Sequence, residues 1–141
     1  MAEISKTAAS LSIQGEYLDH DIITQKLGVF PSSWKRKGEP WFTPNGQKMI
    51  ARFGMWTRSV PRRDPGDLDA QIAEILKPLS TDLTVWKDIT SQFKAYIFCG
   101  LFMEEGNEGI NVAPKTLVAL GSRGLSLEFD IYSPPNDVND E

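Results

Sequence analysis

The stretch KAYIFCGLFM (residues 94–103) decides the fold, because it is the only run in the chain that is apolar on both of its alternating faces. Alternate side chains of a β-strand point to opposite sides of a sheet. One face of this stretch carries Ala95, Ile97, Cys99, Leu101 and Met103. The other carries Tyr96, Phe98 and Phe102 around Gly100. The pattern predicts a central strand whose second face is also covered or binds something.

Further strands are expected on both sides of this stretch. Residues 9–17 alternate between apolar and polar side chains, as do residues 48–59 and 125–132. In residues 48–59, one side is expected to carry Ala51, Phe53, Met55 and Thr57, and the other Arg52, Trp56 and Arg58. In the last strand we expect the core to take Leu125, Leu127, Phe129 and Ile131.

Helices are expected between these strands. Asp19 is a good cap for residues 20–27, and Gly28 can close that helix in the left-handed conformation. Asp67 caps a second helical region, which Pro78 either kinks or divides into two short helices. A third helix starts at Pro114 and stops at Gly121.

This order of elements predicts an α+β fold. We expect about four mostly antiparallel strands in βαβ-α-βαβ order, with the helices packed on one face. The expected organisation is a flexible N-terminus (1–8), a single globular domain (9–132) and a disordered acidic tail (133–141).

Composition narrows the class of protein. The 141 residues suffice for one stable domain, and a single cysteine excludes an internal disulfide framework. One histidine, His20, argues against a His/Cys metal site, so we expect no metal and no cofactor. The first residues lack the apolar core of a signal peptide, and no apolar run approaches the length of a membrane span. We therefore expect a cytoplasmic protein.

Positive charge is concentrated in one segment. The chain has a net charge of -4, yet residues 34–63 hold eight basic side chains against one acid, Glu39. These charges either form internal ion pairs or present an anion site. Within the segment, residues 29–46 contain three prolines and are expected to form a long structured loop. Its tryptophans either pin the loop to the core or stack on a ligand.

Catalytic residues are not evident. An enzyme needs a nucleophile or an acid/base pair in tuned geometry, and the sequence fixes no such group. Cys99 lies in mid-strand, which favours a buried, inert thiol over an activated one. His20 falls in the first turn of a helix, where a surface or capping role fits better than a catalytic one.

Several short motifs together resemble one known family. They are the entry and exit of the first helix (19–28), SWKRKGE (33–39), GMW (54–56), CGLF (99–102), GN-x-G (106–109) and a closing pattern that ends in LEFDIY (127–132). With these motifs the chain is similar, over residues 11–132, to the bacterial domain of unknown function 4279 family. One departure is Ala113 before Pro114, where a serine-like cap is expected. The resemblance implies the fold boundaries and a bacterial cytoplasmic protein, but it transfers no catalytic residue.

Two functions are compatible with these patterns, and an enzyme of unidentified class stays a lesser alternative. The first is a non-catalytic module, of accessory or immunity type, that binds another protein or a second copy of itself through an aromatic sheet face. The candidate residues of that face are Trp56, Tyr96, Phe98, Phe102 and Tyr132. The second is binding of an anion or nucleic acid. It would use Trp34, Lys35, Arg36, Lys37, Arg52, Trp56 and Arg58.

Overall fold

A five-stranded sheet forms the centre of the protein. The computed structural model describes residues 2–135. Along the sheet the strands follow the order β3 (Ser33–Lys35), β6 (Gly54–Arg63), β2 (Lys6–Gly15), β7 (Lys94–Phe102) and β9 (Ser126–Tyr132). β7 and β9 are parallel, and the other neighbours are antiparallel. The expectation of about four strands in βαβ-α-βαβ order is therefore wrong, because the short β3 adds an edge and the sheet is mixed.

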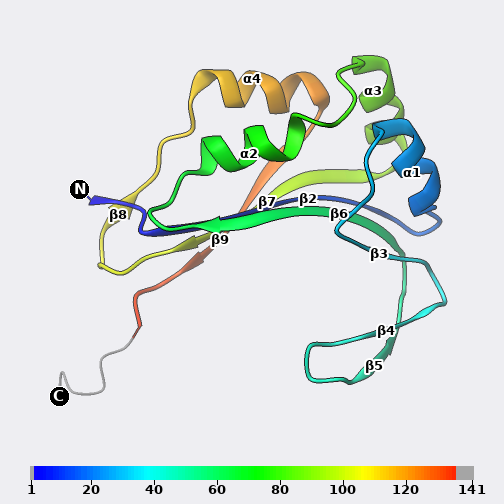
Figure 1. Ribbon diagram of the computed structural model, residues 1–141, viewed down its shortest axis with the longest axis horizontal. Coiled ribbons are helices and arrows are strands. Elements are labelled where there is room, and N and C mark those ends of the chain that lie inside the picture. Colours follow the sequence, from blue (N-terminus) through cyan, green and yellow to red (C-terminus); the bar gives the residue numbers. More distant parts are fainter. Residues whose placement is uncertain (1, 136–141) are drawn as a thin grey trace.

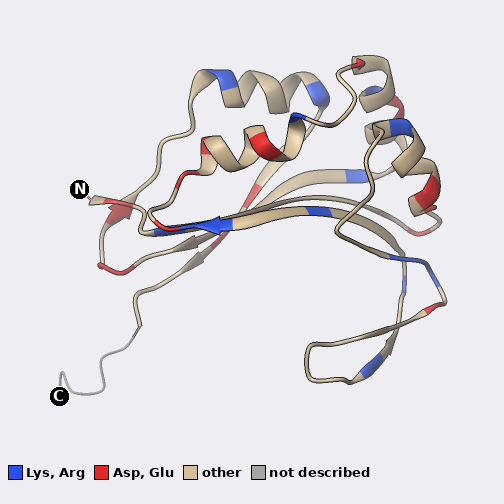
Figure 2. Ribbon diagram, in the orientation of Figure 1, with Lys and Arg blue, Asp and Glu red and all other residues tan. Residues whose placement is uncertain are grey.

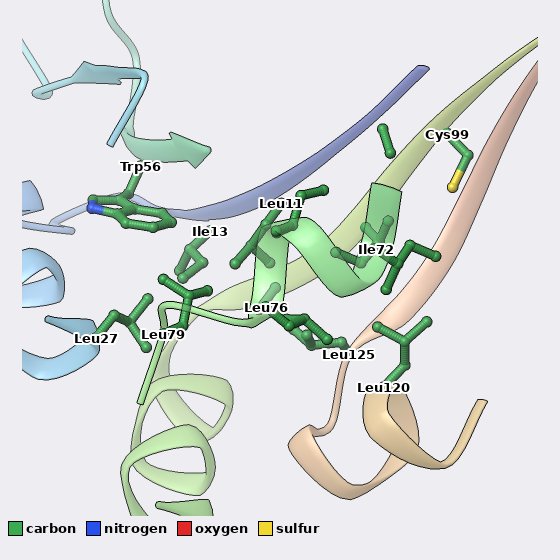
Figure 3. Close-up of a cluster of buried hydrophobic side chains, with 14 of the residues drawn as sticks. Leu11, Ile13, Leu27, Trp56, Ile72, Leu76, Leu79, Cys99, Leu120 and Leu125 are labelled. Carbon is green, nitrogen blue, oxygen red and sulfur yellow. The ribbon is translucent and has the colours of Figure 1, made fainter. Parts of the chain in front are cut away.

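All the described helices cover one face of this sheet, as expected (Figure 1). They are α1 (His20–Leu27), α2 (Leu68–Leu76), α3 (Leu83–Gln92) and α4 (Pro114–Arg123). Between helices and sheet lies one cluster of buried side chains, which includes Leu11, Trp56, Ile72 and Cys99 (Figure 3). Burial of this apolar surface is the main favourable contribution to folding.

β7 has the central position that its sequence predicts. It lies between β2 and β9, and four of its side chains are buried toward the helices: Ala95, Ile97, Cys99 and Leu101. The pairing register places Phe98 beside Ser10 of β2 and Glu128 of β9, on the side without helices.

The predicted helix starts are confirmed. The Asp19 carboxylate accepts from the Asp21 amide, and Gly28 adopts a φ of 84° at the end of α1. The Asp67 side chain accepts from the Ala70 amide at the start of α2.

Pro78 has the second of its two expected effects, and the end of the last helix differs from the sequence pattern. Pro78 divides the second helical region: α2 ends at Leu76, and α3 begins at Leu83 behind the Asp82 cap. The last helix, α4, runs past Gly121 and closes on Gly124, which has a φ of 74°.

The segment expected as one long loop contains strand structure. Besides β3 it holds β4 (Pro40–Phe42), which pairs with β5 (Lys48–Ile50) in a hairpin. The hairpin projects from the end of the sheet, on the side away from the helices (Figure 1). The strand expected over residues 48–59 is thus two strands, β5 and β6, separated by residues 51–53, and β6 continues through Pro61 to Arg63.

The ends of the chain add one small pairing. β1 (Ala2–Glu3) runs parallel to β8 (Glu108–Gly109), and β2 begins at Lys6. Most of the tail that the sequence predicts to be disordered, residues 136–141, lies outside the described residues. Among the helices that the structure describes, none has the length and apolar character needed to cross a membrane.

Candidate functional site

The candidate site is the sheet face opposite the helices, which we call the open face. Paired residues of neighbouring strands point to the same side, so the register defines rows across this face. One row contains Thr57, Ser12, Tyr96 and Ser126, and the next contains Ser59, Ser10, Phe98 and Glu128. Another contains Lys6, Phe102 and Tyr132. Aromatic side chains therefore follow β7 and the end of β9, beside small side chains on β2.

These aromatic side chains reach solvent. Phe98 is 38% exposed and Tyr132 is 44% exposed, while Tyr96 and Phe102 are half-buried. Neighbouring exposed aromatic rings on a sheet face are typical of a binding surface. Tyr96, Phe98 and Phe102 thus lie together on one side of β7, away from the helices.

Two of the rings form a stack with an arginine. The ring centres of Phe102 and Tyr132 lie 4.6 Å apart with planes 4° from parallel, and the Arg62 guanidinium lies 4.7 Å from the centre of the Phe102 ring. Gly100 leaves room for this arrangement, because a Cβ there would lie 3.2 Å from the Phe102 ring. The stack joins β6, β7 and β9 at one end of the open face.

Polar contacts surround the rings. Lys94 lies 3.6 Å from Glu128, and its ammonium lies 4.8 Å from the centre of the Tyr96 ring. A hydrogen bond with the Asp130 carboxylate raises the pKa of the Tyr132 hydroxyl above its ordinary value. The open face thus has an apolar centre and a charged rim of both signs.

The β4–β5 hairpin adds exposed apolar side chains next to this sheet. The Lys35 ammonium lies 3.6 Å from the centre of the Trp41 ring, which ties the hairpin to β3. Phe42 is 64% exposed and Ile50 is 56% exposed. An isolated two-stranded hairpin is only marginally stable in water. Phe42 and Ile50 thus leave apolar surface exposed on the hairpin.

Trp56 and Arg58 do not lie on the open face. Trp56 is fully buried on the helix side, and its Nε1 donates to Thr24 Oγ1 at 3.1 Å. Arg58 also points toward the helices, where its Nε donates to the Ile75 carbonyl oxygen at 3.1 Å. The expected orientation of this strand is wrong because the large Trp56 ring fills the core beneath α1. Met55 and Thr57 take the opposite side of β6 instead.

The basic loop residues make contacts within the protein. Arg36 lies 3.3 Å from Asp19, and Lys37 pairs with Glu16. Trp34 stacks on His20 with ring centres 3.7 Å apart, on the helix side of the sheet. Of the two interpretations of the basic segment, internal ion pairing therefore describes Arg36 and Lys37.

Arg52 stands apart from the other residues of the predicted anion site. It is exposed in the turn between β5 and β6, and it forms no ion pair with the residues that the structure describes. Trp34 and Arg58 lie on the helix side of the sheet, whereas Arg52 lies in the turn before β6. Arg36 and Arg58 each make contacts within the protein.

The possible catalytic groups have structural surroundings. Cys99 is fully buried, and burial raises the pKa of its thiol to about 12. His20 is buried and lies against the Trp34 ring. Within residues 2–135, no three His, Cys, Asp or Glu side chains are grouped so as to hold a metal ion.

Sequence reasoning missed Arg62 next to the candidate site and left the position of Trp41 open. The pattern places Arg62 beyond the end of its strand, whereas β6 continues and carries it onto the Phe102 ring. The strand register is irregular between Val60 and Arg63, so simple alternation could not have found Arg62. Trp41 is placed against Lys35 only by the hairpin.

Fold and site together define a two-layer α+β domain with one uncovered sheet face. The chain belongs to the family described as Domain of unknown function (DUF4279), whose family model matches residues 5–134. No curated protein and no solved structure matches the chain.

Proposed function

We propose that the protein is a non-catalytic module that binds a partner protein through its open face. The observation that carries this proposal is the group of aromatic side chains on β7 and β9, on the sheet side that no described helix covers (Figure 1). Centres of protein interfaces are enriched in Tyr, Phe and Arg, and their rims are polar. Phe98 is the central anchor, and Tyr96, Phe102 and Tyr132 surround it.

The side chains next to the anchor support a protein ligand. Ala8, Ser10 and Ser12 of β2 form a floor of small side chains beside the aromatic residues of β7. Side chains of a partner can lie above this floor and against the Phe98 ring. Aromatic anchors that become desolvated in this way commonly contribute most of the binding energy.

Charge favours a protein over a nucleic acid. The open face carries Glu128 and Asp130 among its cations, and Lys94 is already close to Glu128. These carboxylates repel phosphate groups, and the net charge of -4 acts in the same direction. The experiment therefore includes a nuclease treatment, which distinguishes a protein partner from a single-stranded nucleic acid.

The test compares two matched substitutions on opposite sides of the sheet. Phe98→Glu places a charge at the centre of the open face, whereas Phe129→Glu places it on the helix side, where Phe129 is 44% exposed. Both variants and the wild type are immobilised and exposed to lysate of the source organism, with and without nuclease. Retained proteins are purified, and their dissociation constants are measured for all three.

The proposal expects a partner protein whose dissociation constant rises about tenfold or more with Phe98→Glu and changes by less than about twofold with Phe129→Glu. Equal binding by Phe98→Glu and the wild type contradicts the proposal. A ligand that nuclease removes and that salt releases would identify a nucleic-acid module instead.

A further inference from the structure

A second candidate site lies on the helix side of the sheet, in a groove between α2 and α4. Its volume is about 540 Å³, within the range of roughly 300–1,000 Å³ that small-molecule sites occupy. The middle of the groove is apolar, with Ile72, Ala73 and Leu76 from α2 and Ala119 from α4. This site uses none of the open-face residues, so it goes beyond the proposed function and does not depend on it.

Two cations lie at the end of the groove where both helices finish. Lys77 follows α2 directly and Arg123 is the last residue of α4, and both line the groove together with Thr81. Figure 2 shows Lys and Arg positions in blue at the ends of both helices. Neither cation forms an ion pair with any residue that the structure describes. Arg123 Nη1 donates to the Ala119 carbonyl oxygen at 2.9 Å, which holds the guanidinium beside the groove.

The carboxylates that line the groove lie at its opposite end and are already engaged. Asp67 Oδ1 accepts from the Ala70 amide at 3.1 Å. Asp69 Oδ1 accepts from the Ala113 amide at 3.1 Å and from the Thr116 hydroxyl at 2.5 Å. These acids therefore stabilise helix starts, and they leave the positive charge of Lys77 and Arg123 uncompensated.

We infer that this groove binds a small amphipathic carboxylate, a molecule with an apolar chain and one terminal anionic group. The apolar chain lies along Ile72, Ala73, Leu76 and Ala119, and its carboxylate meets Lys77 and Arg123. Charge complementarity selects the anionic end, because charge-assisted hydrogen bonds from ammonium and guanidinium groups to carboxylate are the strong ones. The apolar walls select an alkyl or aryl chain over a sugar or a nucleotide, which needs convergent polar groups.

The probe for this inference is sodium decanoate, titrated into the 141-residue chain by isothermal calorimetry. Decanol, which has the same chain without the charge, is the matched ligand control. We expect saturable 1:1 binding of decanoate, and binding of decanol at least about tenfold weaker. Absence of saturable decanoate binding up to about 5 mM, or equal affinity for decanol, overturns the inference.

Two variants locate the site. Ala73→Trp fills the groove at an exposed helix position and is expected to abolish binding, with Val118→Trp on the exposed surface of α4 as its control. The double variant Lys77→Gln, Arg123→Gln is expected to weaken decanoate about tenfold or more and leave decanol unchanged. Lys48→Gln on β5 is the charge control. Unchanged decanoate affinity in the double variant contradicts the inference even if Ala73→Trp fails to fold.

Discussion

Asp69 caps a helix to which it does not belong. Its Oδ1 lies 3.1 Å from the Ala113 amide nitrogen and 2.5 Å from the Thr116 hydroxyl oxygen, at the start of α4. Ala113 has no side chain that could cap this helix. A carboxylate on α2 therefore supplies the cap that the local sequence lacks, and it joins two helices that are distant in the chain.

Removal of this cap is expected to destabilise the protein. Asp69→Ala should lower the free energy of unfolding by about 1–2 kcal/mol, because the Ala113 amide and the Thr116 hydroxyl lose their acceptor. Urea denaturation measures the change, and Asp69→Asn, which keeps an acceptor oxygen, should lose less. Ala113→Ser in the Asp69→Ala background should restore part of the stability. An unchanged denaturation midpoint for Asp69→Ala would show that this cap contributes nothing.

A buried amide holds α2 on the sheet. Gln71 is fully buried; its Oε1 accepts from the Thr7 hydroxyl at 2.6 Å, and its Nε2 donates to the carbonyl oxygens of Thr7 and Pro61, each at 3.0 Å. Gln71→Leu leaves these groups unsatisfied in the core, so the free energy of unfolding should fall by about 2–3 kcal/mol. A double-mutant cycle with Thr7→Val, followed by chemical denaturation, measures the coupling. Strictly additive effects would argue against the network.

Two glycines provide a matched pair for steric effects. A Cβ on Gly54 would lie 2.3 Å from the Leu18 carbonyl oxygen, whereas a Cβ on Gly106 would meet no atom within 4 Å. Gly54→Ala should therefore lower the free energy of unfolding by about 1–3 kcal/mol, and Gly106→Ala should leave it nearly unchanged. Thermal denaturation of both variants makes the comparison. Equal stability of the two would show that the backbone near Leu18 can move without cost.

Cys99 should be unreactive in the folded protein. Its pKa is raised to about 12 by burial, so the thiol stays protonated at pH 8, and the thiolate is the reactive species. A colourimetric thiol reagent should modify the chain in denaturant and leave the native protein unmodified. Rapid modification of the native protein would contradict this account of the site.

The Cys99 thiol should make the free energy of unfolding fall as the pH rises above 9.0. The folded protein keeps the Cys99 proton from the ordinary pKa of 9.0 up to about 12, whereas the unfolded chain releases it. The contribution to stability is therefore fully present below pH 9 and is lost as the pH rises through this range. Cys99→Ala should show a shallower decrease in the free energy of unfolding between pH 9 and 11. Identical slopes for the variant and the wild type would show that Cys99 does not cause the pH dependence.

Local signals in the sequence predicted part of the fold. The caps at Asp19 and Asp67 depend on residues close in the chain, and the two apolar faces of residues 94–103 determine the position of β7 without further information. The helix-covered face and the open face of β7 follow from alternation alone.

Features that depend on contacts between distant parts of the chain could not be predicted from local sequence patterns. The side of the sheet on which Trp56 lies is decided by the space beneath α1, and β3 exists because β6 provides its partner. Phe129 and Ile131 alternate like core residues, yet they are 44% and 60% exposed because β9 is an edge strand. Likewise, the ion pairs of Arg36 and Lys37 need acids that lie earlier in the chain.

In the proposed complex a partner protein covers the open face. Covalent footprinting of aromatic side chains, before and after addition of the purified partner, detects this directly. Phe98, Phe102 and Tyr132 should lose labelling in the complex, while Phe129 and Tyr17, which are exposed elsewhere, should keep theirs. Protection of Phe129 with unchanged labelling of Phe98 would contradict the claim.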